Sequence, residues 1–254
     1  MLVFGFQAVN GFEEWDLPDL TAPTSMKPLS LEFQIQHQFA DSAFTSESFN
    51  RFFGLGDFAN VVVGLRADVW KTAQIYASFG NTQTLMLTRW EYIVGGAYAV
   101  PIPWIFMNAQ IDAQFFSYAA FDQNNTRTEG GFYNLSLRND PIFERVVFLV
   151  NAGYDSDQRR FGLGIGADVK VLENFDVYGT YFPKVDKSPH SYGYDNATGT
   201  YNPFCFGVKM TTGGHQFFLF VDNSTEVGVR HLMQGAIDNA PRFGFMIKRL
   251  FSFE

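Results

Sequence analysis

The stretch RFGLGIGADVK, Arg160–Lys170, decides how this chain folds. It contains G-x-G-x-x-A, the pattern of a dinucleotide-binding turn, in which the glycines follow a buried strand and open a helix. The alternation of residue types nevertheless continues through the glycines without a break. Apolar side chains share one face, and small, polar or charged ones share the other: Phe161, Leu163, Ile165, Ala167 and Val169 against Arg160, Gly162, Gly164, Gly166, Asp168 and Lys170. A period of two predicts a β-strand without a nucleotide site, and its glycines lie on a face where bulk is unfavourable.

Composition indicates a surface that does not face water. Charged residues are only 17% of the 254 residues and aromatic residues are 18%, with 30 Phe. Soluble domains carry roughly 25% charged residues. The net charge is −8 and the basic residues are scattered, which argues against a nucleic-acid partner. The apolar run around residues 93–107 is interrupted by Pro101 and Pro103, so no transmembrane helix is expected.

The same alternation recurs from residue 30 to the end of the chain and gives about twelve strands, with a range of about 10–14. A sheet of this size must curl or close, and closure removes the edges that recruit other chains. The sequence therefore predicts an all-β fold with two parts: an extended N-terminal segment over residues 1–29 and a closed antiparallel barrel over 30–254. Residues 225–239 depart from the pattern and are expected to form a short helix or a long external loop.

Three features favour a barrel that turns its apolar face toward lipid. The polar face is rich in Gln, Asn, Ser, Tyr and Gly, which suits an enclosed lumen, and glycine leaves room for neighbours there. Aromatic residues gather at segment ends, as in the girdles of transmembrane barrels. Charges avoid the apolar face, except His37 and Arg249, which are expected near a membrane interface. The prediction is a transmembrane β-barrel in a bacterial outer membrane, with the lipid bilayer as its partner and a soluble all-β binding module as a rival.

Polar and charged residues on the inner faces are the candidate site. They are expected to line the lumen: Arg66, Asp68, Asn108, Gln110, Asp112, Arg160, Asp168 and Lys170. One interpretation is a set of salt bridges that block a narrow barrel. The other is a passage for small polar solutes, because barrels of about this strand number range from filled to open.

No motif of catalysis, cofactor binding or metal binding is present. The sequence lacks H-E-x-x-H, a P-loop and G-x-S-x-G, and the four histidines have no ligand spacing. Cys205 is expected to be a small apolar strand residue, and Asp155 to Asp157 to be a solvated turn rather than a calcium loop. The prediction is a chain that is not an enzyme, without catalytic, cofactor-binding or metal-binding residues.

Four segments together resemble a known family. They are LEFQIQHQF (31–39), FGLGDFANVVVGL (53–65), TGGHQFFLF (212–220) and FGFMIKRLFSF (243–253). In this order they are similar to outer-membrane β-barrels of Bacteroidota that are classed only as a domain of unknown function. The resemblance spans residues 30–253, with departures at Gln38 and Ala40. It implies the barrel fold and the outer-membrane location, and it supplies no activity or catalytic residues.

The expected role is structural: a non-enzymatic barrel subunit or anchor that docks a periplasmic or surface partner. Residues 1–29 are expected to plug the lumen or to bind that protein partner. The first alternative is a pore or transporter for small polar solutes.

Overall fold

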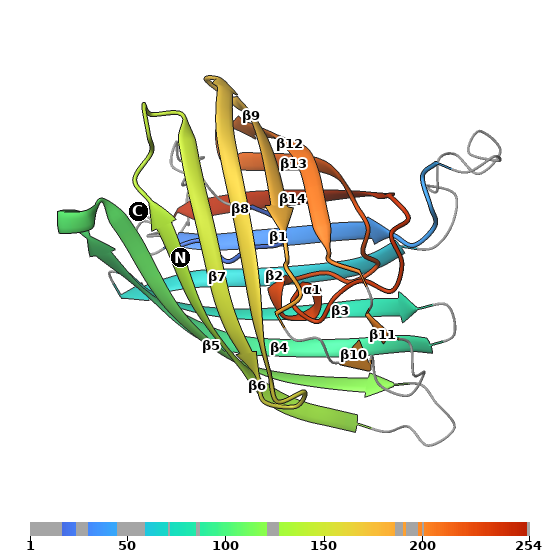
Figure 1. The fold of residues 1–254 in the computed structure, drawn as a ribbon. Helices are drawn as coiled ribbons and strands as arrows, with labels where there is room; N and C mark the ends of the chain where they lie inside the picture. Colours follow the sequence, from blue (N-terminus) through green and yellow to red (C-terminus); the bar gives the residue numbers. More distant parts are fainter. Residues whose placement is uncertain are drawn as a thin grey trace, which may run out of the picture.

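The computed structural model describes residues 17–23, 30–44, 59–70, 72–84, 87–120, 127–185, 190–191, 198–199 and 201–252. Within them, twelve antiparallel strands close into a barrel (Figure 1). Their bounds are β1 Ser30–Phe39, β2 Ala59–Trp70, β3 Ala73–Thr84, β4 Leu87–Ile102, β5 Met107–Ala120, β6 Arg127–Asn139, β7 Val146–Asp155, β8 Arg160–Leu172, β9 Phe175–Tyr181, β12 Phe204–Thr212, β13 His215–Asp222 and β14 Arg242–Ser252. The predicted closed, antiparallel, twelve-stranded barrel is confirmed. Residues 1–16 and 24–29 of the expected N-terminal segment lie outside the described residues.

The barrel closes where β1 pairs with β14. Their antiparallel ladder sets Gln34 opposite Lys248 and Ile35 opposite Ile247. β1 also pairs with β2, so each of the twelve strands has two hydrogen-bonded neighbours. Lipid offers no hydrogen bonds to a backbone, and a closed ladder satisfies every strand within the protein.

The two ends of the barrel differ in the length of their connections. Short turns occupy one end, at residues 71–72, 173–174 and 213–214, and this end also holds the start of β1 and the end of β14. The three longest intervals between successive wall strands, residues 40–58, 182–203 and 223–241, separate strand ends at the other end, which we call the loop end and which also holds the short turn 156–159. Short turns face the periplasm and long loops face outward in bacterial barrels.

Three small elements lie in the connections. The 3-10 helix η2, Pro103–Ile105, forms part of a short turn, and the two-stranded pair β10, His190–Ser191, and β11, Thr198–Gly199, belongs to a loop. The helix α1, Val229–Leu232, lies in the connection between β13 and β14. Residues 225–239 thus contain the short helix that was one of the two expectations. No helix in the described part of the chain is long and apolar enough to cross a membrane.

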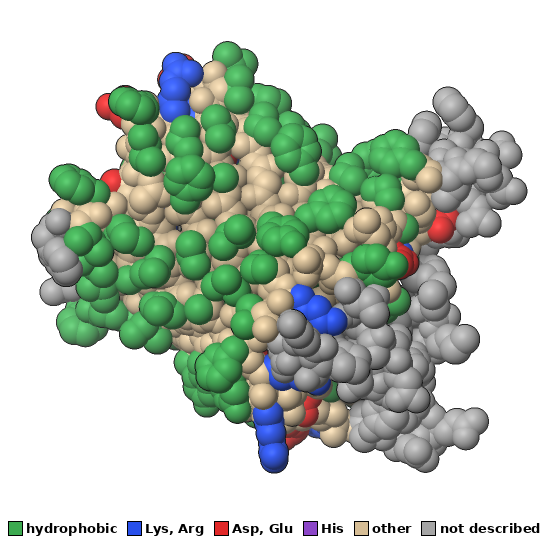
Figure 2. All heavy atoms as spheres, in the orientation of Figure 1, with side chains coloured by type: hydrophobic (Ala, Val, Ile, Leu, Met, Phe, Trp, Pro, Cys, Tyr) green, Lys and Arg blue, Asp and Glu red, His purple; other side chains and the backbone are tan. Residues whose placement is uncertain are grey.

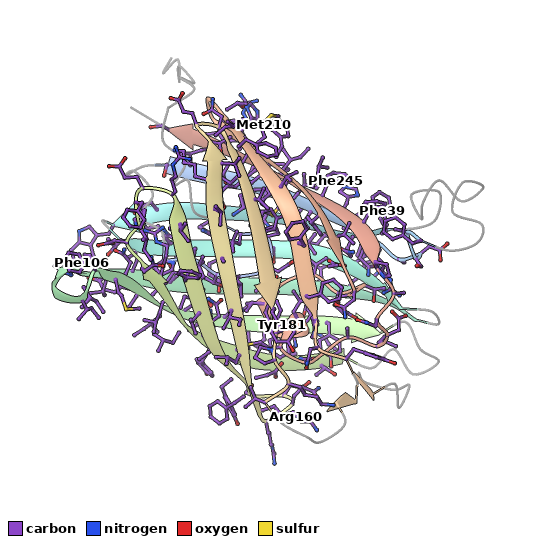
Figure 3. The ribbon with its side chains drawn as sticks, turned by 45° about the horizontal axis from the view of Figure 1, so that its top comes forward. Phe39, Phe106, Arg160, Tyr181, Met210 and Phe245 are labelled. Carbon is purple, nitrogen blue, oxygen red and sulfur yellow. The ribbon has the colours of Figure 1, made fainter. Side chains whose placement is uncertain are left out.

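The apolar face of the strands points outward. Phe161 is 70% exposed and Ile165 42%, whereas Asp168 on the same strand is fully buried. Figure 2 shows hydrophobic side chains spread over the barrel wall. Phe39 and Phe245 lie together on the outside near the loop end, with ring centroids 6.3 Å apart (Figure 3). This is the orientation that the alternation and composition predicted.

His37 and Arg249, the outer-face residues expected near a membrane interface, lie close to strand ends. His37 stacks on Phe245 with ring centroids 4.5 Å apart, and β1 ends just beyond it at Phe39. Arg249 pairs in register with His215, the first residue of β13, and lies over the ring of Phe251. Both positions allow the polar group to reach the aqueous boundary.

Two segments that do not belong to the wall lie inside the barrel, and we call them the inner segments: residues 17–23 and 226–236. Leu17 and Leu20 join a buried apolar cluster with inner-face residues of the wall such as Phe116 and Phe132. Figure 1 shows α1 within the ring of strands. The lumen is therefore largely filled by the chain itself.

The glycines of the 160–170 stretch face these inner segments. A Cβ at Gly162 would lie 2.3 Å from Cβ of Met233, and one at Gly166 would lie 2.5 Å from Leu20. Glycine weakens a strand, but here the inner segments occupy the space that a larger side chain would fill.

Arginine at mid-strand on the outer face is expected to destabilise the barrel. Ile165→Arg should lower the free energy of unfolding by about 2–4 kcal/mol, because it places a charge in the hydrocarbon, whereas Leu172→Arg at the turn end should cost about 0–1 kcal/mol. Reversible urea unfolding in lipid vesicles measures both. Equal costs at the two positions would contradict the outward orientation.

Candidate functional site

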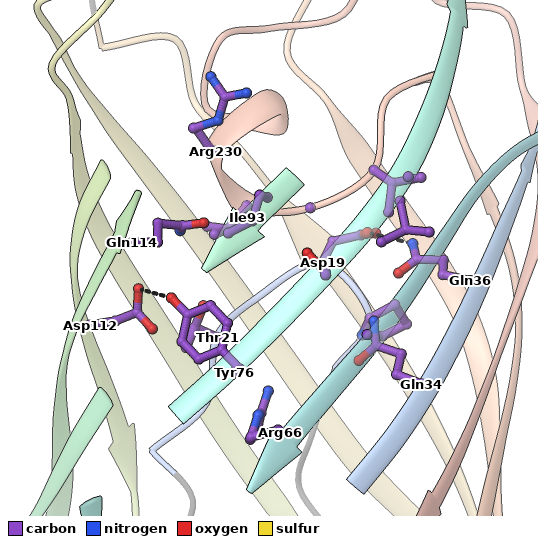
Figure 4. A pocket seen from close by; sticks show the side chains of 18 of the residues that line it. Asp19, Thr21, Gln34, Gln36, Arg66, Tyr76, Ile93, Asp112, Gln114 and Arg230 are labelled. Carbon is purple, nitrogen blue, oxygen red and sulfur yellow. Dashed lines mark hydrogen bonds between the residues drawn. The ribbon is translucent and has the colours of Figure 1, made fainter. Parts of the chain in front are cut away.

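A cavity of about 180 Å³ lies between the inner segments and the wall formed by β1 to β5. Polar and charged side chains make up much of its lining: Glu32, Gln34, Gln36, Arg66, Gln74, Tyr76, Ser78, Glu91, Gln110, Asp112, Gln114, Arg230, His231 and Lys248. Figure 4 looks into it, with Arg66 toward one end and Arg230 toward the other. The inner segments thus make apolar contacts with one part of the barrel wall, and the polar cavity separates them from another part.

The acidic groups of the cavity wall are paired. Glu32 lies 3.9 Å from Arg66 and 3.7 Å from Lys248. The Tyr76 hydroxyl donates to Asp112 Oδ1 at 2.8 Å, as Figure 4 shows. A wall of paired charges and glutamine amides offers both donors and acceptors to a polar solute.

Arg230 fixes α1 to the wall. Its guanidinium contacts Glu91 on β4, donates to Asp155 Oδ2 on β7 at 3.1 Å, and lies 3.8 Å from the centre of the Phe116 ring. Burial alone would lower the pKa of Arg230, but the carboxylates of Glu91 and Asp155 raise it. The guanidinium therefore stays charged, and removing it would leave two buried carboxylates uncompensated.

Two further contacts hold the same inner segment. His231 Nε2 lies 2.7 Å from Glu91 Oε2, and Gln234 donates to Asp155 Oδ2 at 2.9 Å. The predicted turn is present, with Asp157 N donating to Asp155 Oδ1 at 2.9 Å, but Asp155 itself is not solvated, because it is only 4% exposed. The sequence signal misled because the residue ends its strand, while its partners come from the connection between β13 and β14.

The other inner segment is held by backbone and side-chain hydrogen bonds. Thr21 N donates to Asn151 Oδ1 and Asn151 Nδ2 donates to Thr21 O, both at 2.9 Å. Asp19 Oδ1 accepts from Gln36 Nε2 at 3.1 Å. Burial raises the pKa of Asp19 to about 6, although hydrogen bonds from Gln36 and the Cys205 thiol act in the opposite direction.

The predicted lumen residues divide into groups. Arg66, Gln110 and Asp112 are brought together at the cavity. Asp68 and Asp168 are buried on the inner face away from its lining. Asp168 instead pairs with Lys209, whose Nζ also lies 2.8 Å from Asp176, in a buried cluster.

The remaining three lie toward strand ends and outside the cavity lining. Asn108 donates to Asp140 at 2.9 Å at the exposed turn end. Arg160 and Lys170 are half-buried near the two ends of β8. Sequence reasoning missed Glu91, Arg230 and His231: Glu91 follows the inner-face parity of β4, but nothing local placed α1 in the lumen.

Comparison with known proteins agrees with this geometry. Residues 133–251 match a described family. It is a membrane-bound β-barrel domain, DUF5777. The match confirms the resemblance to a barrel family of unknown function. It does not show that the chain comes from Bacteroidota. The chain is an outer-membrane β-barrel in contact with the lipid bilayer.

Solved structures similar to this barrel show its fold alone, because all are distant in sequence. LpxR from Salmonella typhimurium is 9% identical, with a TM-score of 0.50 over 88% of this chain and 100% of that one. The KdgM porin in complex with disordered oligogalacturonate is 7% identical, with a TM-score of 0.49 over 89% and 99%. Outer membrane phospholipase A from Escherichia coli is 10% identical, with a TM-score of 0.48 over 87% and 97%. No curated protein matches the chain.

Replacing Arg230 is expected to loosen the inner segment. Arg230→Met should lower the free energy of unfolding by about 3–5 kcal/mol, because it leaves two buried carboxylates without a compensating positive charge. The matched control is Arg127→Met, since the Arg127–Glu129 pair at 2.9 Å has side chains 65% and 51% exposed and should contribute about 0–1 kcal/mol.

Urea unfolding in vesicles measures both costs, and proteinase K cleavage within residues 226–236 should accelerate only for Arg230→Met. Similar costs for the two variants would show that α1 is not fixed by this ion pair.

Proposed function

We propose that this barrel is a non-enzymatic passage for small polar solutes, gated by its inner segments. The observation that supports it is the polar cavity between those segments and the wall of β1 to β5. In this account residues 17–23 and 226–236 act as a plug, and solutes move along the polar wall when the plug shifts.

The size and chemistry of the cavity favour small, polar cargo. At about 180 Å³ it is below the roughly 300–1,000 Å³ of pockets for drug-sized ligands. Basic and acidic groups alternate with amides around it, so a single sign of charge does not dominate. Small sugars, amino acids or similar neutral and zwitterionic solutes suit such a lining.

The gate follows from how the plug is attached. Residues 226–236 belong to the long β13–β14 connection at the loop end and are held by Arg230 and His231. The Glu91 carboxylate contacts both Arg230 and His231, so weakening these contacts would release α1 from β4. The carboxylates of the cavity wall act here as structural and solute-facing charges rather than as catalysts.

A structural role is the second candidate function. The observation that favours it is the packing of Leu17, Leu20 and Met233 against the glycine face of β8 and its neighbours. A permanently filled barrel would serve as an anchor, with residues outside the lumen docking a protein partner.

Filling the cavity should block the passage. Gly64 lies in the cavity lining, and the atom nearest to a Cβ there is Ser78 Cβ at an ordinary 3.7 Å, so Gly64→Trp can extend into the space. We expect liposomes with the native barrel to swell in a small sugar, and Gly64→Trp to remove most of that permeation.

The matched control is Ala113→Trp on the exposed outer face of β5, which should permeate like the native protein. Heat-modifiable gel migration confirms that each variant is folded. A native barrel that never permeates, alone or after Arg230→Met, would favour the anchor, and unchanged permeation in Gly64→Trp would exclude this route.

A further inference from the structure

A second polar cluster joins residues 17–23 to the opposite wall. Candidate ligand atoms of Asp19, Cys205 and Asp222 all lie within 4.8 Å of one another. Each of the three residues is only 3% exposed. The cluster combines the inner segment with neighbouring strands, since Cys205 on β12 is opposite Asp222 on β13 in the ladder.

Two glutamines on β1 orient the carboxylates. Gln36 Nε2 donates to Asp19 Oδ1 at 3.1 Å, and Gln38 Nε2 donates to Asp222 Oδ1 at 2.8 Å. Each bond engages one oxygen of its carboxylate. Hydrogen bonds of this kind commonly orient the ligands of metal sites.

Buried oxygens around the cluster have few hydrogen-bond partners. The hydroxyl of Tyr178 has none in the described part of the chain, and the Asp19 carboxylate and the Thr180 hydroxyl share the Cys205 thiol as a partner. Thr180 is directly opposite Cys205 in the β9–β12 ladder, so their side chains share one inward-facing site. The Tyr178 hydroxyl lies over Gly207, where a Cβ would be 2.6 Å away. Buried polar atoms without partners are rare, and an unpartnered Tyr178 hydroxyl beside two carboxylates and a thiol points to a missing ligand.

The positive charge beside the cluster is Arg242, which is opposite Asp222 in the β13–β14 ladder and is shared with other acceptors. The Arg242 guanidinium is engaged by Asp238 at 2.8 Å and by the Ala40 carbonyl at 2.9 Å. Two carboxylates in a buried site are unfavourable without a cation.

We propose that Asp19, Cys205 and Asp222 bind one divalent transition-metal ion, for which Zn²⁺ is the best match. Zinc accepts thiolate and carboxylate ligands in a tetrahedral arrangement, whereas calcium and magnesium prefer oxygen alone. Three protein ligands leave a fourth position for water, which can donate to the hydroxyl oxygens of Tyr178 and Thr180. Binding releases the thiol proton, and any carboxyl proton, to solvent.

Such an ion would tie residues 17–23 to β12 and β13. The metal site does not depend on the proposed passage, because Asp19, Cys205 and Asp222 lie together whether or not solutes cross the barrel. Asp19 also lines the cavity, which gives the ion a route to the cluster.

Metal content of the purified barrel tests the site. After chelation, exposure to Zn²⁺ and gel filtration in detergent, the native protein should retain about one zinc per chain. Cys205→Ser and Asp222→Asn should lose it, and Gln38→Ala should bind about 10- to 100-fold more weakly. His215→Ala, which removes an imidazole outside the cluster, should bind like the native protein.

Co²⁺ provides an independent readout. The native protein should show a thiolate-to-metal absorption band in the near ultraviolet that Cys205→Ser lacks, with heat-modifiable migration showing that both are folded. The proposal is overturned if the native protein retains no zinc, or if Cys205→Ser retains as much. Zinc that disappears with His215→Ala would equally overturn it.

Discussion

The need to pair every backbone polar group inside a lipid bilayer is the constraint on which the rest of this structure depends. Pairing β1 with β14 meets it, because the ladder then has no open edge among the twelve strands. Once the strands form a closed ring, successive side chains along each strand alternate between the outside and the inside of the barrel. The apolar face meets lipid, as the exposed Phe161 shows, and the polar face with Asp168 is enclosed.

An enclosed polar face creates a second problem, which is how to fill the lumen. Residues 17–23 and 226–236 fill it against one wall with apolar contacts, made possible by glycines that leave space on the inner face of β8. Against the other wall the charges are paired and a cavity remains. The same barrel thus combines a closed half with a polar half, and the proposed gating follows from that asymmetry.

Much of the fold follows from the sequence, because alternation is a local property. Residues 160–170 already show which side chains face lipid, and similar segments give the strand number. The inner-face parity also places Arg66, Gln110 and Asp112 in the lumen. It does not tell which inner residues meet, as the burial of Asp155 illustrates. Arg230 is far from Glu91 and Asp155 in the chain, and such contacts depend on how a connection folds back into the barrel.

The outward orientation of β8 can be measured directly. Single cysteines at positions 160, 161, 163, 165, 167, 169 and 170, in a Cys205→Ser background, would carry a nitroxide label in lipid vesicles, and collisions with oxygen would report lipid exposure. We expect high oxygen collision rates at Phe161, Leu163, Ile165, Ala167 and Val169, and low rates at Arg160 and Lys170, which lie on the inner face and are half-buried. A reversed pattern, or no alternation along the strand, would contradict the account.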